Sequence, residues 1–379
     1  MTAERIVPSL LPQPGTHHLA ARDVARQHAP STTIDDDGAE FREAWKHFAD
    51  FGVFRLTIPD AGLDVDTVLN TLEGLGEGTR NAGFLLSIGA HSFAAGAAIS
   101  QFGSEGQRQV LDRMRDGSVI AAFASTESEA GSDVMSLRTR CVAVDDDYVL
   151  DGTKHFITNA WLADYFVVFA TKDRRLNWRG VTAFLVPRDT PGLSVGPPQR
   201  LIGLSSCSMS TVNLDSVRVP RSAMLGRLGH GSLVFRHAML WERSLLAALA
   251  LGAMRRQLTE VIDAALAHQR AAASASDPDV VCQVVDIGGR YLVGQLLVRD
   301  TVTKLAASTL TPGQASLTKL WISEAELATS RELAATGTTT ELVSGSRTGE
   351  LLNAVGATIY SGTSDIQRKI IAAELGIFQ

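Results

Sequence analysis

The amino-acid sequence predicts a mixed α+β protein in which a helical segment, a β-rich segment and a second helical segment follow one another. Three observations predict this order: aromatic residues at helical spacing near the start, short β-branched runs between turn residues in the middle, and long stretches with helical periodicity at the end. With 379 residues, the chain has room for roughly two to three domains and for a core that needs no disulfide or metal support.

The first part of the chain divides into an arm and a helical domain. Residues 1–35 contain four prolines and show no clear hydrophobic period, so we predict a loosely held N-terminal arm. Phe41, Trp45 and Phe48 recur at the spacing of one helix face. We therefore expect an N-terminal helical domain at residues 36–119.

The remaining sequence predicts two further domains. A central β-domain is expected at residues 120–228, with strands in the β-rich runs 142–149, 165–170, 181–186 and 212–219. A C-terminal helical domain is expected at residues 229–379. Its predicted helices span residues 233–269, 280–307, 313–335 and about 364–375, and a loop rich in Gly, Ser and Thr is predicted at 336–349.

Charge and cysteine content exclude several classes of protein. A net charge of −6 and a pI of about 5.9 argue against nucleic acid or an anionic membrane as the main partner. Cys141, Cys207 and Cys282 are far apart, which indicates neither a disulfide framework nor a metal site, and a reducing cytoplasm fits best. The longest apolar run, residues 244–254, is shorter than the ~20 residues that span a bilayer.

Three short stretches could carry chemistry. Residues 126–133 (TESEAGSD) and 152–160 (GTKHFITNA) could each be an ordinary turn or hairpin with polar caps. Residues 359–367 (IYSGTSDIQ) lie at the start of the last predicted helix. Together, in this order and at this spacing, the three stretches resemble motifs of the acyl-CoA dehydrogenase family, and the resemblance covers roughly residues 35–379.

The resemblance implies an N-terminal helical domain, a central β-barrel or sandwich domain and a C-terminal four-helix bundle, usually in a homotetramer. It also implies FAD between the β-domain and the bundle, with Phe156 to Thr158 over the flavin face away from the substrate. The residues implied to contact FAD are Phe123, Ser125, Thr126, Gly131, Ser132, Phe156, Ile157, Thr158, Arg270, Thr363 and Asp365.

The catalytic base is where this chain departs from most of the family, because Ser361 stands where most members carry a glutamate. Removing the weakly acidic α-proton of an acyl thioester needs a carboxylate in a dry pocket. In isovaleryl- and long-chain-type members the base is a glutamate followed by arginine early in the first bundle helix, which matches Glu242 and Arg243. An acidic residue near a helix start can also be a simple partner of the helix dipole. The apolar residues 244–249 that follow favour Glu242 as the base.

The substrate side is also implied by the resemblance, at Ser132, Met239, Leu240, Arg243, Tyr360, Ser361 and Gly362. The backbone N–H of Ser361 could donate to the thioester carbonyl oxygen as enolate charge develops. Leu240 stands where some CoA-using members have an Asp that contacts the nucleotide end, which hints at a carrier other than free CoA. Arg243 could be a substrate-side cation or a structural ion-pair partner.

The motifs at the adenosine end of FAD are eroded. Of the family's Arg-x-x-Phe-Gly, which grips the cofactor of a neighbouring subunit, only Arg270 remains, and the glutamine that follows it, Gln283, is two positions late. The family's Gln-x-x-Gly-Gly aligns with residues 334–338, where one glycine remains. FAD could therefore bind weakly, or a different partner subunit could complete its site.

Three functions remain open. The first is FAD-dependent α,β-dehydrogenation of an acyl-CoA or acyl-carrier-protein thioester, in which Glu242 takes the α-proton and hydride passes to flavin N5. Its electrons would go to an electron-transfer flavoprotein or to oxygen. The second is a flavoprotein oxidase or monooxygenase on the same scaffold, and the third is a cofactor-poor subunit that pairs with an active homologue. We expect the first, in a homo-oligomer (dimer or tetramer), with neither nucleic acid nor a membrane as partner.

Overall fold

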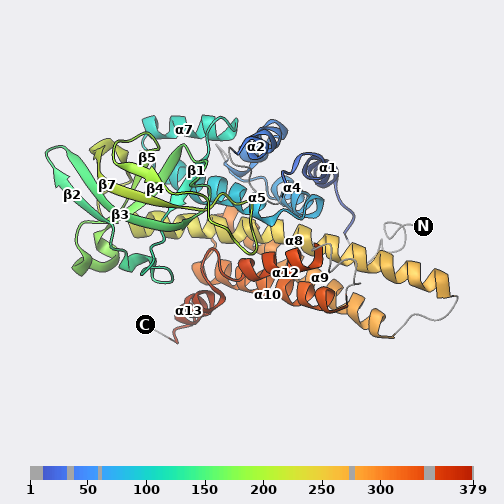
Figure 1. The fold of residues 1–379 in the computed structure, drawn as a ribbon. Coiled ribbons are helices and arrows are strands. Elements are labelled where there is room, and N and C mark those ends of the chain that lie inside the picture. The colour runs from blue at the N-terminus through green and yellow to red at the C-terminus, as the bar shows by residue number, and fades with distance from the viewer. Residues whose placement is uncertain (1–11, 32–37, 59–61, 273–277, 337–345, 378–379) are drawn as a thin grey trace. The chain divides into compact units, whose positions relative to one another are not determined.

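The chain divides into two compact units. The computed structural model describes residues 12–31, 38–58, 62–272, 278–336 and 346–377. The sheet unit comprises residues 30–63 and 83–242, and the bundle unit comprises residues 1–29, 64–82 and 243–379. Helix α8 (Gly231–Ala272) begins in the sheet unit and continues in the bundle unit (Figure 1).

The helices of the sheet unit bury the aromatic residues that the sequence placed on one face. They are α2 (Ala39–Phe51), α3 (Val53–Thr57), α5 (Ala82–Ile88), the π-helical segment η2 (Gly89–Gly96), α6 (Ala97–Phe102) and α7 (Glu105–Arg115). Phe41, Trp45 and Phe48 are at most 2% exposed, and the Phe84 ring lies against all three at 4.9–6.0 Å between ring centroids. The predicted helical periodicity is confirmed here.

A buried histidine in η2 anchors the first strand. The Nδ1 atom of His91 accepts the Ala121 N–H at 3.0 Å, so its Nε2–H donates to the Met114 carbonyl at 3.2 Å. Burial lowers the pKa of His91 to about 3, which keeps the ring neutral and able to serve as both donor and acceptor.

The central sheet contains every β-rich run that the sequence predicted. Its strands follow the order β6-β7-β3-β2-β4-β5-β8, and β1 pairs with β4 in parallel. The run 142–149 is divided by a turn between two antiparallel strands. The strands are β1 (Ala121–Ala124), β2 (Arg140–Val144), β3 (Asp147–Ile157), β4 (Tyr165–Thr171), β5 (Val181–Pro187), β6 (Leu193–Val195), β7 (Ser210–Pro220) and β8 (Met224–Leu225).

Strand β4 supplies both cores of the sheet unit. Val167 and Phe169 belong to a cluster that includes residues of α6 and α7. Phe166 and Val168 belong to a second cluster with β3 and β7. This division follows the two-residue period of a strand.

Seven helices carry the bundle unit over its described residues. They are α1 (Thr16–His28), α4 (Val65–Gly78), the second part of α8, α9 (Pro278–Ala306), α10 (Pro312–Thr336), α12 (Ser346–Ala357) and α13 (Ser364–Glu374). The prediction of a loosely held arm is wrong for residues 16–28, which form α1. The predicted loop at 336–349 is wrong at its end, because α12 begins at Ser346; residues 337–345 lie outside the described residues.

Glycines allow close packing of α4. A Cβ at Gly74 or Gly78 would lie 2.3 Å from the carbonyl oxygen of His18 or Arg22 in α1. A Cβ at Gly76 would lie 1.9 Å from the carbonyl oxygen of Leu249 in α8. Helix α1 is therefore held by tertiary packing on α4, which the periodicity of its own sequence does not reveal.

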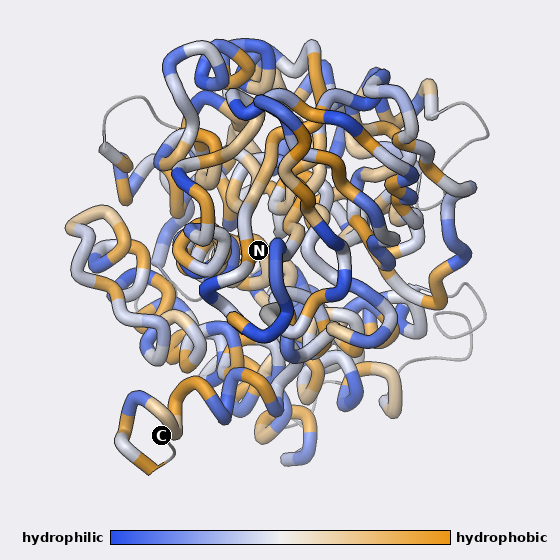
Figure 2. Tube along the Cα trace, turned by 90° about the vertical axis from the view of Figure 1, so that its left-hand side faces the viewer, coloured by the Kyte–Doolittle hydropathy of each residue, from blue (hydrophilic) through white to orange (hydrophobic). Residues whose placement is uncertain are grey.

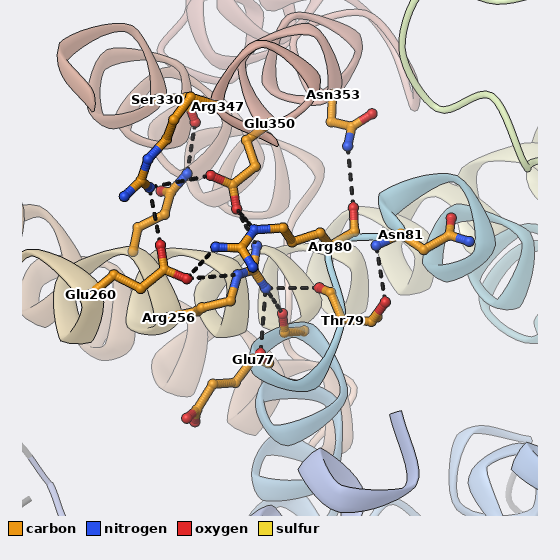
Figure 3. Close-up of polar contacts among 12 residues, drawn as sticks. Glu77, Thr79, Arg80, Asn81, Arg256, Glu260, Ser330, Arg347, Glu350 and Asn353 are labelled. Atoms are coloured by element: carbon orange, nitrogen blue, oxygen red, sulfur yellow. Dashed lines mark hydrogen bonds and ion pairs between the residues drawn. The ribbon is translucent and has the colours of Figure 1, made fainter. Parts of the chain in front are cut away.

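An ion-pair network ties α4, α8 and α12 together (Figure 3). Glu350 accepts from Arg80 Nε and from Arg256 Nη2, each at 3.0 Å, and Arg347 Nη1 lies 3.0 Å from Glu260. Burial opposes ionisation of Glu350, but the charges of Arg256 and Arg80 outweigh it and lower its pKa. Glu350 therefore stays ionised at neutral pH, and the network is a structural element of the bundle unit.

Two helical segments, 82–102 and 278–306, are long and apolar enough to cross a membrane by length and composition alone. The first is 94% buried in its apolar window, as expected of a core helix, whereas α9 is 17% buried there. Hydrophobic and hydrophilic residues alternate within most segments along the Cα trace (Figure 2), which is the pattern of elements that bury one face.

Candidate active site

Two of the three predicted motifs lie side by side in the sheet unit. Strand β1 ends at Ala124, and the chain turns through Ser125 and Thr126 toward residues 127–132. The Thr126 carbonyl accepts the His155 N–H of β3 at 2.9 Å. The predicted cofactor residues at 123–132 and 156–158 therefore lie on neighbouring segments of the sheet unit.

A buried ion pair fixes this junction. Glu127 Oε1 accepts from Lys154 Nζ at 2.8 Å, and the same carboxylate accepts from the backbone N–H groups of Arg138 (2.6 Å) and Thr139 (3.0 Å). Lys154 is fully buried, and burial lowers its pKa to about 8, with Glu127 offsetting part of the effect. Burial opposes ionisation of Glu127, but Lys154 and the hydrogen bonds outweigh it and lower its pKa. Both groups are charged at neutral pH.

A β-bulge in β3 turns an aromatic ring outward beside this junction. The register with β7 shifts between Lys154 and Ile157. Phe156 has φ 56°, which is uncommon for a non-glycine residue, and its side chain is 58% exposed, whereas Ile157 is buried. A conformation of this kind is costly and points to a functional surface.

The exposed Phe156 ring offers an apolar face of the kind that the resemblance implies for an isoalloxazine ring, and Thr126 lies in the neighbouring segment, bonded to His155 through its carbonyl. Ser132 is exposed in the turn that follows. Nothing lies within 4 Å of a Cβ built on Gly131, so the turn faces open space. The Phe123 ring is half-buried and packs edge-to-face on Phe169 at 5.0 Å, which fixes the end of β1.

The third motif forms a tight turn in the bundle unit. Ser361 (φ 55°) and Gly362 (φ 94°) are both left-handed. The Ser361 carbonyl accepts from Arg243 Nε at 3.1 Å and from Gln367 Nε2 at 3.0 Å. The Gly362 carbonyl accepts from Lys319 Nζ at 2.9 Å and from Gln367 Nε2 at 2.7 Å. Three side chains from three helices therefore hold the turn by its main-chain oxygens.

The remaining predicted residues of this motif lie around the turn. The Tyr360 ring centroid lies 5.8 Å from Lys319 Nζ. Thr363 is the N-cap of α13, and its hydroxyl accepts from the Ile366 N–H at 3.4 Å. Asp365 is exposed in the first turn of that helix.

The predicted base and its arginine lie in the first third of α8. Glu242 is the last residue of the sheet unit, and Arg243 begins the C-terminal segment of the bundle unit. Both are buried, at 8% and 6% exposure. Arg243 also donates to Ser316 Oγ at 3.3 Å. Its contacts with the turn support the structural reading of Arg243. Met239 is buried and Leu240 half-buried one turn earlier.

Arg270 is remote from these groups. It lies 27 residues after Arg243 in the same helix, about 40 Å along the axis at 1.5 Å per residue. It is exposed in the last turn of α8. Gln283 donates to the Thr336 hydroxyl at 3.2 Å, and residues 337–338 of the eroded motif lie outside the described residues. The resemblance implies that Arg270 grips the diphosphate and adenine of FAD bound to a neighbouring subunit, and this stays a prediction.

Several residues with close contacts around these motifs were not predicted from the sequence. Glu127 and Lys154 lie inside the predicted motifs without an assigned role, and Gln367 ends the third motif. Lys319 and Glu326 lie on α10. Neither belongs to a sequence motif, so the sequence alone does not mark them as buried or as contacts of the turn. Among the residues that the structure describes, no group of three His, Cys, Asp or Glu side chains could hold a metal ion.

Comparison with known proteins identifies the family. Models of the acyl-CoA dehydrogenase N-terminal, middle and C-terminal domains match residues 17–118, 122–217 and 229–376. The chain belongs to the acyl-CoA dehydrogenase family. The predicted family and its α+β fold of helical, sheet and helical domains are thereby confirmed.

Individual relatives carry more specific names than the family. An L-prolyl-[peptidyl-carrier protein] dehydrogenase of Pseudomonas fluorescens is 35% identical over 341 residues, 87% of this chain and 89% of the relative. The crystal structure of the prolyl acyl carrier protein oxidase AnaB matches with a TM-score of 0.84 and 31% identity, over 96% of this chain and 99% of that one. The FAD complex of PigA matches with a TM-score of 0.86 and 27% identity, over 95% and 97%. Acyl-thioester dehydrogenation with FAD, predicted from the resemblance, agrees with these relatives.

Proposed function

We propose that this protein is an FAD-dependent dehydrogenase of an acyl group bound as a thioester to a carrier protein. The observation that carries the proposal is the bond from Arg243 to the Ser361 carbonyl, since it joins the helix of Glu242 to the turn where most of the family holds its base. Leu240 in place of an Asp and the two carrier-protein relatives support a carrier protein over free CoA.

The residues of the chain divide the chemistry between them. Glu242 takes the α-proton, and the N–H of Ser361 donates to the thioester carbonyl oxygen, which stabilises the developing enolate charge. Bound FAD would supply the hydride acceptor for the β-carbon of the acyl group. Phe156, Thr126 and Ser132 would hold its ring system, and the Glu127–Lys154 pair keeps the two supporting segments together.

The decisive test replaces Glu242 with glutamine, which keeps size and hydrogen bonding but cannot accept the proton. We expect Glu242→Gln to bind FAD as the unchanged protein does and to reduce it about 10²–10⁴-fold more slowly, the usual contribution of a general base. Anaerobic bleaching of the flavin absorbance by an L-prolyl-loaded peptidyl carrier protein measures the rate. Glu105→Gln, at the exposed start of α7, is the matched control.

The outcomes separate the competing functions. Full bleaching by Glu242→Gln refutes the assignment of the base. If Glu242 is the base, Ser361→Glu combined with Glu242→Ala should restore part of the rate, because the resemblance places both positions at one substrate carbon. A purified protein that takes up no FAD would favour the cofactor-poor subunit.

The electron acceptor defines the second candidate. The matched relative AnaB is named an oxidase, which favours oxygen over an electron-transfer flavoprotein. Peroxide formation during turnover in air, measured against turnover with an artificial acceptor, distinguishes the two. Turnover in air that forms no peroxide and needs the added artificial acceptor would refute oxygen as the acceptor.

We further propose a cytoplasmic homo-oligomer. In the bundle unit, large apolar side chains are 41–72% exposed, at Val285, Leu296, Trp321 and Ile359. Exposed apolar residues in such numbers support a subunit interface. Cys141 and Cys207 are free thiols, which fits a reducing compartment. Light scattering during gel filtration should give the mass of a dimer or tetramer.

A further inference from the structure

Two neighbouring segments of the sheet unit concentrate positive charge. Residues 172–180 and 226–236 together carry six Lys or Arg residues and one carboxylate, Asp173, in a chain whose net charge is −6. All six cationic side chains are exposed. Such a concentration creates a local field of opposite sign to that of the whole protein. The cations are Lys172, Arg174, Arg175, Arg179, Arg227 and Arg236.

The two segments are in direct contact. The Gly229 N–H donates to Thr182 Oγ1 at 3.0 Å. A Cβ at Gly229 would lie 2.8 Å from the Arg179 carbonyl oxygen, and one at Gly231 would lie 2.7 Å from the Val181 side chain. The cations therefore belong to one surface around the start of β5 and the start of α8.

Most of these cations are not neutralised within the protein. Arg175 pairs with Asp173 at 2.8 Å. Over the part of the chain that the structure describes, Arg174, Arg179, Arg227 and Arg236 form no ion pair. Paired surface charges contribute little to recognition, whereas unpaired ones steer an oppositely charged partner.

Large apolar side chains lie among the charges. Leu176, Trp178, Leu228 and Leu233 are 40–50% exposed. The Arg179 guanidinium lies 4.9 Å from the centroid of the Trp178 ring. Asn177, between Leu176 and Trp178, has φ 48°, a strained conformation for a non-glycine residue. Exposed tryptophan and arginine side chains among apolar residues are typical of protein–protein interfaces.

The surface continues toward the candidate active site. Leu233, Arg236 and Leu240 lie at i, i+3 and i+7 on α8, so they share one face of the helix. Leu233 precedes Glu242 by nine residues, about 14 Å along the axis. A carrier protein that docks at the exposed start of α8 can therefore place its thioester along this helix, toward Glu242.

We propose that this basic–apolar patch is the docking surface for the acidic carrier protein that delivers the acyl thioester. The proposal rests on the function proposed above. Free CoA would satisfy the charges through its phosphates, but it would leave Leu176, Trp178 and Leu228 exposed. A protein with acidic residues around a small apolar centre covers both parts of the patch.

The test reverses charge in the patch with Arg179→Glu plus Arg227→Glu. The control is Arg26→Glu, an exposed arginine of α1 in the bundle unit. The first readout is fluorescence anisotropy of a labelled holo-peptidyl carrier protein of net negative charge, which needs no turnover. We expect its Kd to rise at least tenfold in the double variant and to stay unchanged in the control. We also expect Kd of the unchanged protein, but not of the double variant, to rise steeply between 50 and 500 mM salt.

The second readout separates docking from chemistry. With the L-prolyl carrier protein, KM should rise at least tenfold while kcat holds, and an N-acetylcysteamine thioester should react at an unchanged rate. A Kd unchanged by charge reversal overturns the proposal, as does an equal rise in KM for a CoA thioester, or an effect confined to reoxidation by an electron acceptor. If no thioester reduces the flavin although carrier binding depends on the patch, the proposed function fails while the docking surface stands.

Discussion

Glu326 provides a sharp test of electrostatics inside the bundle unit. It lies on α10, is 8% exposed and faces the apolar residues Leu246, Ala247 and Ile322. Burial raises its pKa from the ordinary value of 4.5 to about 7, and Glu350 adds to the shift while the positive charge of Arg256 opposes it. A carboxyl of this kind holds its proton in the folded protein where the unfolded chain has lost it.

The sign of the effect follows from the direction of the shift. Because the folded pKa lies above the unfolded one, the unfolded chain releases its proton first, so stability falls as pH rises from 4.5 to 7 and stays lower above that. A difference of about 2.5 pKa units corresponds to about 3 kcal/mol at 1.36 kcal/mol per unit. Glu326→Gln has no proton to lose, so we expect it to gain about 3 kcal/mol relative to the unchanged protein between pH 4.5 and pH 8.

The assay is chemical denaturation followed by far-UV circular dichroism at several pH values. Any constant cost of the amide cancels, because the quantity compared is the change in ΔΔG with pH. Glu324→Gln is the matched control on the same helix, since the Glu324 side chain is 42% exposed. Parallel pH profiles for Glu326→Gln and the unchanged protein would show that Glu326 ionises normally and would refute the reasoning.

Two further predictions address packing. Lys154→Met leaves the buried Glu127 carboxylate without its counter-charge, so we expect a loss of about 3–5 kcal/mol in unfolding free energy and weaker FAD binding, measured by denaturation and by FAD titration. Adding Glu127→Gln should recover part of both losses. A double variant no more stable than Lys154→Met would count against the ion pair. Gly76→Ala places a Cβ 1.9 Å from the Leu249 carbonyl oxygen and should cost about 1–3 kcal/mol, whereas Gly289→Ala, with nothing within 4 Å, should stabilise by up to about 1 kcal/mol; equal melting temperatures for the two variants would contradict this account.

The strands and long helices could be predicted from the sequence because each buries its own periodic apolar residues. Helix α1 could not, since its stability depends on contacts of His18 and Arg22 with Gly74 and Gly78 of α4, each 56 residues further along the chain. Lys154 could not be predicted as buried, because a lysine in a strand is ordinarily exposed and only the carboxylate of Glu127 makes its burial possible.

The exposure of Phe156 depends on a β-bulge, which the alternation of buried and exposed residues along a strand does not predict. In β3, Leu150 and Lys154 point inward with a two-residue period, which would bury Phe156 and expose Ile157. The register shift after Lys154 reverses the two, so Ile157 enters the core and Phe156 faces outward. The resemblance to a family named both residues, but only the bulge explains why the phenylalanine is available to a flavin.

The contacts of the Tyr360–Gly362 turn explain how this chain can carry serine where most of its family has a glutamate. Arg243, Lys319 and Gln367 bind the carbonyl oxygens of Ser361 and Gly362. None of these bonds uses the side chain at position 361, so all of them can form with either serine or glutamate at that position. A base can therefore be lost from the turn without loss of the turn itself, and the N–H of Ser361 keeps its place. Arg243 is the α8 residue that holds the turn. The carboxylate can then come from its neighbour in the same helix, Glu242.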